Sequence, residues 1–190
     1  PDENPWNSWM RFGDFDFLDG GNSAAISTWN GDVWRVDGLD AGLKNLRWQR
    51  IASGLSQPLG LLTRGESGQE EILVLGRDQI TRLVDLDDDG ETDHYEGFNV
   101  DAMNSPHFHE PAGGLQEGPD GSIYYLKAAR HAKLPAHPQH GTLIQVVADG
   151  SSSKMVASGF RAPNGLAVDA DGIAWGSDQE GHWMPANRIN

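Results

Sequence analysis

The stretch APNGLAVDADGIAWGSDQEGHW, residues 162–183, decides the fold of this chain. It holds a short apolar run, an Asp-Gly turn, a second apolar run and a polar loop. Two short apolar runs joined by a tight turn predict an antiparallel β-hairpin. A lone hairpin is marginally stable in water, so this one requires further strands beside it.

The same pattern recurs upstream. It appears in residues 57–87, and again in residues 110–128 together with 141–150. The equivalent glycines are Gly60, Gly114 and Gly165, which are 54 and 51 residues apart. A weaker copy covers residues 15–37. A repeat of about 40 to 50 residues with four short strands is typical of the blades of a β-propeller.

We therefore predict an all-β fold, a single β-propeller of the six-bladed type over residues 1–190. About three and a half four-stranded blades are expected, at 12–54, 55–104, 105–159 and, incomplete, 160–190. The last has only the strands 165–168 and 173–176. Gly, Pro and Asp-Gly turns are too frequent for a helical period, so no helix is expected.

A ring of this type needs more strands than this chain supplies. The first interpretation is that a longer polypeptide provides the remainder. The second is that two copies form a homodimer that completes the ring. The third is that residues 1–12 add a strand to the last blade.

The composition excludes several classes of function. The formal net charge of −14 at pH 7 argues against binding nucleic acid, which needs a basic surface. No run approaches the roughly 18 to 20 apolar residues that cross a bilayer, so membrane insertion is not expected. Cysteine is absent, which excludes disulfides and covalent c-type haem within these residues.

Propeller topology is expected to bring six of the seven histidines to one face, because the loop entering a first strand and the loop leaving a second strand share an end. Such converging loops are common binding and catalytic sites, and solvation of a central channel is the alternative. The histidines are His107, His109, His131, His137, His140 and His182. The other polar residues expected there are Gln57, Arg77, Asp78, Arg130, Arg161, Asn164, Asp178 and Gln179.

A metal site is one use of these histidines. His107 and His109 are expected on one side of an extended segment, with Glu110 on the other. With His131 from a neighbouring loop, the pair could hold a divalent metal. The spacing of the histidines in residues 131–140 matches no standard zinc pattern, and two prolines favour an extended loop whose histidines are exposed.

Residues 85–96, DLDDDGETDHYE, match the ligand pattern of an EF-hand calcium loop without its flanking helices. We interpret this segment as a calcium clip on a hairpin, with a solvated acidic turn as the alternative. The expected ligands, at loop positions 1, 3, 5, 7, 9 and 12, are Asp85, Asp87, Asp89, Glu91, Asp93 and Glu96.

The tryptophans are assigned by their place in the repeats. Trp29, Trp34, Trp48 and Trp175 lie in or beside expected strands and are predicted to pack between blades. Trp183 could stack on a sugar ring, with packing over a neighbouring blade as the alternative.

Residues 159–183 and 80–98 resemble the six-bladed propeller domain of sugar dehydrogenases. This group includes soluble quinoprotein glucose dehydrogenase and sorbosone dehydrogenase, and the most similar members are membrane-bound types often joined to a c-type haem domain. The resemblance covers about residues 6–190. It implies oxidation of a sugar hydroxyl or hemiacetal, a periplasmic or extracellular location, and a quinone (PQQ) that receives hydride while a histidine takes the proton.

Carried onto this chain, the resemblance implies the following roles. The base is His109, with His131 as a further catalytic candidate, and the arginines that would pair with cofactor carboxylates are Arg77, Arg130 and Arg161. The residues expected around the carbohydrate-like ligand and the cofactor are Arg130, Arg161, Asn164, Gln179, His182 and Trp183.

Two other functions remain open. The element PNGLAVDADG is also similar to gluconolactonase-type propellers, in which an asparagine at the position of Asn164 binds a central metal. That similarity implies a metal-dependent lactone or ester hydrolase. The other alternative is a non-catalytic propeller that binds a carbohydrate or a protein.

Overall fold

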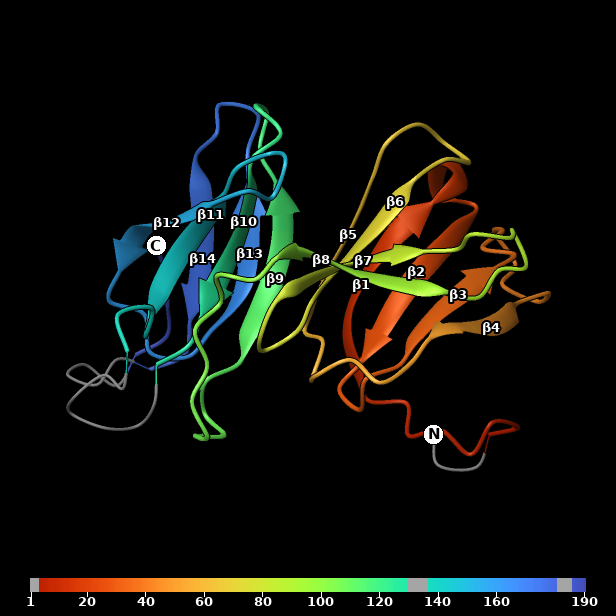
Figure 1. Ribbon diagram of the computed structural model, residues 1–190, viewed down its shortest axis with the longest axis horizontal. Helices are drawn as coiled ribbons and strands as arrows, with labels where there is room; N and C mark the ends of the chain where they lie inside the picture. Colours follow the sequence, from red (N-terminus) through yellow and green to blue (C-terminus); the bar gives the residue numbers. More distant parts are fainter. Residues whose placement is uncertain (1–3, 130–136, 181–185) are drawn as a thin grey trace. The chain divides into compact units, whose positions relative to one another are not determined.

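The computed structural model describes residues 4–129, 137–180 and 186–190. Within these residues every regular element is a strand, apart from the short 3-10 turn Asp19–Gly21. The strands form four sheets, each ordered as in the sequence (Figure 1). The all-β prediction is therefore confirmed.

The strands of the sheets have the following bounds. The first sheet contains β1 (Phe12–Leu18), β2 (Ser23–Thr28), β3 (Val33–Asp37) and β4 (Arg47–Ala52). The second contains β5 (Gly60–Arg64), β6 (Glu71–Leu75), β7 (Ile80–Val84) and β8 (His94–Asn99). The third contains β9 (Ala112–Glu117), β10 (Ile123–Lys127), β11 (Thr142–Val146) and β12 (Ser153–Ser158). The fourth contains β13 (Pro163–Val168), β14 (Ala174–Asp178) and β15 (Arg188–Ile189).

The last sheet differs from the prediction, because it has a third strand. β15 pairs antiparallel with β14, and Ser177 lies opposite Ile189. A two-residue strand carries no alternating pattern that a sequence could reveal, which explains why it was missed. The described residues hold four sheets, and the six-bladed type stays a prediction.

The chain divides into two compact units. The first comprises residues 1–76 and 81–97, and the second comprises residues 77–80 and 98–190. In the first unit, β1 and β5 pack side by side. Its core is formed by apolar residues from both sheets, among them Leu18, Ala25, Val33, Leu61 and Val74.

Two carboxylates of β1 hold the first strand of the next sheet. Asp14 accepts a hydrogen bond from the backbone N–H of Leu61 at 2.9 Å, and Asp16 accepts one from Thr63 at 2.8 Å. Both carboxylates therefore satisfy main-chain donors of β5, which in an edge strand would otherwise face solvent or another chain.

The second unit repeats this packing. β9 and β13 lie side by side, and β10 also contacts β13. Leu126, Leu143 and Phe160 form a buried cluster there, with Leu166 packed against it. The first strands of neighbouring sheets are thus adjacent in both units, as the repeated pattern predicts.

Among the described residues, no helix is long and apolar enough to span a lipid bilayer.

Candidate functional site at the entry-loop end

The loops before β9 and β13 lie beside the chain that leaves β10, and the loop before β13 also lies beside the end of β14. Backbone hydrogen bonds connect them: Ala128 donates to Pro111 at 2.9 Å, Ala129 to Arg161 at 2.8 Å, and Gln179 to Ala162 at 3.3 Å. We call this part of the second unit the entry-loop end. It consists of residues 100–111, 128–129, 137–141, 159–162 and 179–180.

Four histidines belong to this end. His107 and His109 lie in the loop before β9, and His137 and His140 lie in the turn before β11. The exposed His94, by contrast, begins β8. The prediction of a shared face concerned six histidines, of which His131 and His182 lie outside the described residues.

The centre of the entry-loop end is a fully buried carboxylate, Glu110. Its Oε1 lies 2.5 Å from the Ser105 hydroxyl and 2.6 Å from Nε2 of His140, and its Oε2 lies 3.1 Å from Nε2 of His137. Burial alone would raise the pKa of Glu110, but the hydrogen bonds from Ser105 and the two histidines outweigh it and lower the pKa to about 2. The carboxylate is therefore ionised at neutral pH.

Lys127, at the end of β10, is also fully buried beneath this loop. Its Nζ donates to the carbonyl oxygen of Glu110 at 3.2 Å and to that of Arg77 at 3.4 Å. Burial lowers the pKa of Lys127 to about 8, against the opposing attraction of Glu110. Burial also lowers the pKa of His137, so this imidazole is neutral at pH 7.

Gln139 connects the turn before β11 to the loop before β9. Its Oε1 accepts a hydrogen bond from the backbone N–H of Met103 at 2.7 Å, and its Nε2 donates to the carbonyl of Asp101 at 2.8 Å. The side chain is 8% exposed. These buried bonds fix the two segments against each other.

His107 and His109 lie in the same loop as Glu110 and are less buried. Both are half-buried, and their ring centroids are 6.0 Å apart. The backbone N–H of His109 donates a hydrogen bond to the ring atom Nδ1 of His107 at 3.2 Å. Phe108 between them is 71% exposed. Glu110 faces His137 and His140, and residues 108–109 form a turn in place of the expected extended segment.

The side chain of Arg77 is hydrogen-bonded to the backbone of the same loop. Its Nη2 donates to the carbonyl of His107 at 2.6 Å and to that of Ser105 at 3.2 Å. In this arrangement Arg77 positions the loop that carries His109.

The grouping of Glu110, His137 and His140 was not predicted from the sequence. The prediction of an exposed loop for both histidines was wrong, because their side chains are 7% and 2% exposed. The partners are 27 and 30 residues apart, so local spacing could not reveal the contact. The available signal was a glutamate directly after the His-x-His pair.

A second group of predicted residues lines a cavity of about 390 Å³ in the fourth sheet. Asn164 and Gln179 both line it, together with Ser177, Asp178, Asn187, Arg188 and Ile189. Arg161 is connected to this group, because its Nη1 donates to the carbonyl of Gln179 at 3.2 Å and its backbone N–H donates to Asp178 at 3.0 Å.

The remaining predicted site residues at this end are Arg130, His131, His182 and Trp183. They lie outside the residues that the structure describes.

No family model matches this sequence, and no curated protein sequence matches it. Solved structures do match. A carbohydrate-active enzyme of family AA12 from Trichoderma reesei is 13% identical, with a TM-score of 0.72 over 95% of this chain and 51% of its own. A glucose dehydrogenase-type oxidoreductase of Thermus thermophilus is 20% identical, with a TM-score of 0.69 over 93% and 60%. The PQQ domain of pyranose dehydrogenase from Coprinopsis cinerea is 9% identical, with a TM-score of 0.67 over 88% and 43%.

The chain has the fold of a β-propeller. It spans about half the length of the solved structures that it matches. At these identities the likeness concerns the fold, and the chemistry of the site has to be argued from its own residues.

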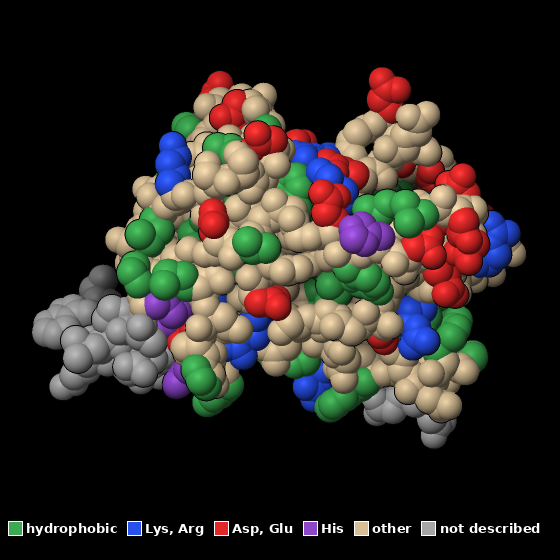
Figure 2. Space-filling view, viewed as in Figure 1, with side chains coloured by type: hydrophobic (Ala, Val, Ile, Leu, Met, Phe, Trp, Pro, Cys, Tyr) green, Lys and Arg blue, Asp and Glu red, His purple; other side chains and the backbone are tan. Residues whose placement is uncertain are grey.

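The acidic turn of the propeller's second sheet brings part of the predicted calcium loop together. Carboxylate oxygens of Asp85, Asp87 and Asp89 lie within 4.8 Å of one another. Asp85 accepts a hydrogen bond from the N–H of Gly90 at 2.8 Å. Acidic side chains, red in Figure 2, are dense over this part of the surface.

The other predicted calcium ligands have different surroundings. Glu96 lies in β8 and forms an ion pair with Arg82 at 2.9 Å, while Asp93 accepts a hydrogen bond from the N–H of Leu86 at 2.8 Å. Glu91 lines a groove instead.

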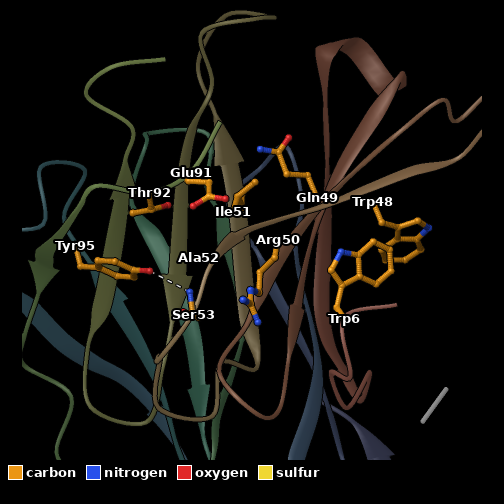
Figure 3. A pocket seen from close by; sticks show the side chains of 10 residues that line it. All are labelled: Trp6, Trp48, Gln49, Arg50, Ile51, Ala52, Ser53, Glu91, Thr92 and Tyr95. Carbon is orange, nitrogen blue, oxygen red and sulfur yellow. Dashed lines mark hydrogen bonds between the residues drawn. The ribbon is translucent and has the colours of Figure 1, made fainter. Parts of the chain in front are cut away.

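That groove, of about 370 Å³, lies along β4 in the first unit (Figure 3). Trp6, Trp48 and Tyr95 are among its lining residues, and the Tyr95 hydroxyl accepts a hydrogen bond from the N–H of Ser53 at 3.0 Å (Figure 3). Trp34, predicted to pack between blades, is fully buried, but Trp175 is 50% exposed.

Proposed function

We propose that this propeller is a sugar oxidoreductase whose substrate binds at the entry-loop end. The observation that carries the proposal is the half-buried pair His107 and His109, in a loop that the buried polar residues Glu110, Lys127 and Gln139 hold in place. The cavity that Asn164 and Gln179 line lies in the same unit. The fold shared with a glucose dehydrogenase-type oxidoreductase and a pyranose dehydrogenase domain supports the same choice.

In this proposal His109 is the general base. An imidazole is suited to taking a proton from a sugar hydroxyl near neutral pH. Arg77 holds the backbone of the loop, and Glu110 with its two histidines anchors it from the buried side. The chain thus fixes the position of the base before substrate binds, which favours catalysis.

The residues that would hold a quinone of the PQQ class are Arg161, Asn164 and Gln179. A guanidinium group and two side-chain amides can donate hydrogen bonds to the carboxylates and carbonyls of such a cofactor. The three residues also lie close together, because Arg161 donates to the carbonyl of Gln179 and the residues Asn164 and Gln179 line one cavity. When bound, the quinone would supply the hydride acceptor.

A metal-dependent lactone or ester hydrolase is the second candidate, favoured by the three-residue group at Glu110 that could hold a metal. The burial of these three side chains argues against the hydrolase. The three side chains are between 0% and 7% exposed, so a metal there would have little access to a substrate carbonyl.

The partner and location proposals follow from the same resemblance. We propose a carbohydrate-like ligand, a periplasmic or extracellular location, and a ring completed either by a longer polypeptide with a haem c domain or by a second copy. The match covers about half of the length of each of these solved structures, which supports the proposal of a larger assembly.

The test is aldose-dependent dye reduction by the native polypeptide that carries residues 1–190, with and without added PQQ. We expect activity only with the quinone. His109→Gln should lower kcat by about 10²- to 10⁴-fold, because a general base contributes this much. His94→Gln, in an exposed position outside the entry-loop end, is the matched control and should retain activity.

Two results would contradict the proposal. Sugar binding without turnover would identify a binding module. Quinone-independent hydrolysis of lactones or esters would support the hydrolase.

A further inference from the structure

We propose that Glu110, His137 and His140 form a binding site for a divalent metal of the zinc class. The site would connect the loop before β9 to the turn before β11. It is distinct from the acidic turn at residues 85–89, and it belongs to the buried part of the entry-loop end at which the substrate is proposed to bind.

The geometry of the three side chains carries this inference. Their ligand atoms all lie within 4.8 Å of one another, and the two imidazole centroids are 4.1 Å apart. Two donor atoms bound to one tetrahedral zinc are about 3.3 Å apart, given bonds of about 2.0 to 2.1 Å. The distance of 3.1 Å between Glu110 Oε2 and His137 Nε2 is close to this value. His140 Nε2 lies 2.6 Å from the other carboxylate oxygen, Oε1, so the carboxylate would have to rotate to share one ion with both imidazoles.

The donor types select the class of metal. Two imidazoles and one carboxylate are the protein ligands of many zinc sites and of facial-triad iron sites. Calcium and magnesium prefer six or more oxygen ligands, which this set does not supply. The fourth position of a tetrahedral ion would be taken by water or by the Ser105 hydroxyl, which already lies 2.5 Å from Glu110.

The charge of the cluster also favours a cation. The carboxylate of Glu110 has no solvent exposure, and buried acidic groups in proteins are paired or coordinate metals. The ammonium group of Lys127 lies on the backbone carbonyl of Glu110, while the carboxylate faces imidazole nitrogens. A divalent ion placed between the three groups would neutralise that carboxylate directly.

The metal would position the loop and would not itself act on the substrate. The ligands come from two segments that Gln139 already joins, and one of them carries His107 and His109. Loss of the metal should therefore loosen the loop before β9.

The experiment measures zinc in the native polypeptide that carries residues 1–190, after zinc loading and dialysis, and follows a cobalt titration by visible absorption. We expect one zinc per chain at this site and the spectrum of tetrahedral cobalt. His137→Gln and His140→Gln should each weaken zinc binding by about 100-fold or more, since even outer-shell changes cost 10- to 100-fold. His94→Gln is the matched control and should leave zinc binding unchanged.

Three outcomes would overturn the inference. The first is a folded wild-type protein that binds no zinc, which would identify a metal-free hydrogen-bonded cluster. The second is loss of zinc in His107→Gln or His109→Gln while His137→Gln retains it. The third is an X-ray absorption spectrum of the zinc-loaded wild type that shows only oxygen ligands, which would exclude the two imidazoles. This measurement needs no variant, so it tests the inference even if the variants fail to fold. Because zinc content is read separately from dye reduction, each proposal can fail without the other.

Discussion

Gly141 shows how a single residue shapes the entry-loop end. It adopts a φ of +65°, and a Cβ built on it would lie 2.1 Å from the carbonyl oxygen of Phe160. Its own carbonyl accepts hydrogen bonds from the N–H groups of Gly159 and Phe160, at 3.0 and 3.1 Å. Only glycine permits both the backbone conformation and this close approach.

Replacing Gly141 should therefore destabilise the second unit more than replacing Gly159. Gly159 also has a positive φ, of +104°, but a Cβ there meets nothing within 4 Å. We expect Gly159→Ala to cost about 1 to 2 kcal/mol of unfolding free energy from conformation alone, and Gly141→Ala to cost clearly more because backbone must move. Urea denaturation measures both, and equal losses would show that the close approach carries no energy.

Glu110 illustrates what a residue pattern can and cannot predict. Alternation along an extended segment predicted Glu110 on the side opposite His107 and His109, whereas residues 108–109 form a turn. It could not predict that the buried side would meet His137 and His140, since that contact depends on a turn from a different part of the sheet.

The acidic turn between β7 and β8 is the element with the most specific sequence motif. Its first three alternate carboxylates converge, as in an EF-hand loop, but the carboxylate at position 12, Glu96, is held by Arg82 within the sheet. The strand that follows the turn thus replaces the helix that would present this ligand in an EF-hand.

This arrangement predicts calcium binding through the first half of the turn. At 100 times its dissociation constant, calcium should stabilise the first unit by about 2.7 kcal/mol. Asp87→Asn should remove most of this gain, whereas Glu96→Gln should retain most of it because Glu96 is paired with Arg82. Thermal unfolding with and without calcium provides the measurement, and an undiminished gain in Asp87→Asn would refute the assignment.

At the scale of the whole molecule, each unit exposes an apolar sheet face. In the first unit Phe15 and Phe17 of β1 are 58% and 54% exposed, with their rings 5.8 Å apart. In the second unit Ile173 and Trp175 are 53% and 50% exposed. Exposed apolar surface of this kind is typical of protein–protein contacts, and in a propeller each sheet face is covered by the next sheet.

We therefore expect the isolated chain of residues 1–190 to self-associate. The double change Phe15→Ser with Phe17→Ser should lower its mean mass in light scattering at a fixed concentration, since it removes apolar contact area. Leu86→Ser is the control, because Leu86 is 72% exposed but lies in the acidic turn. A wild-type chain that stays monomeric at high concentration would argue that these faces need no partner.

The sequence by itself determined the all-β class and the repeated four-stranded pattern. These features follow from short-range rules, namely alternation of apolar residues, turn residues and chain order, which act within about 50 residues. The third strand of the last sheet escaped prediction because two residues carry no period.

Only the tertiary structure decided which polar residues touch. Asn164 and Gln179 share a cavity, Arg77 holds the loop of His109, and Glu110 is buried against His137 and His140. Each of these contacts joins segments that neighbouring strands or sheets bring together, and its energy depends on burial that no local pattern encodes.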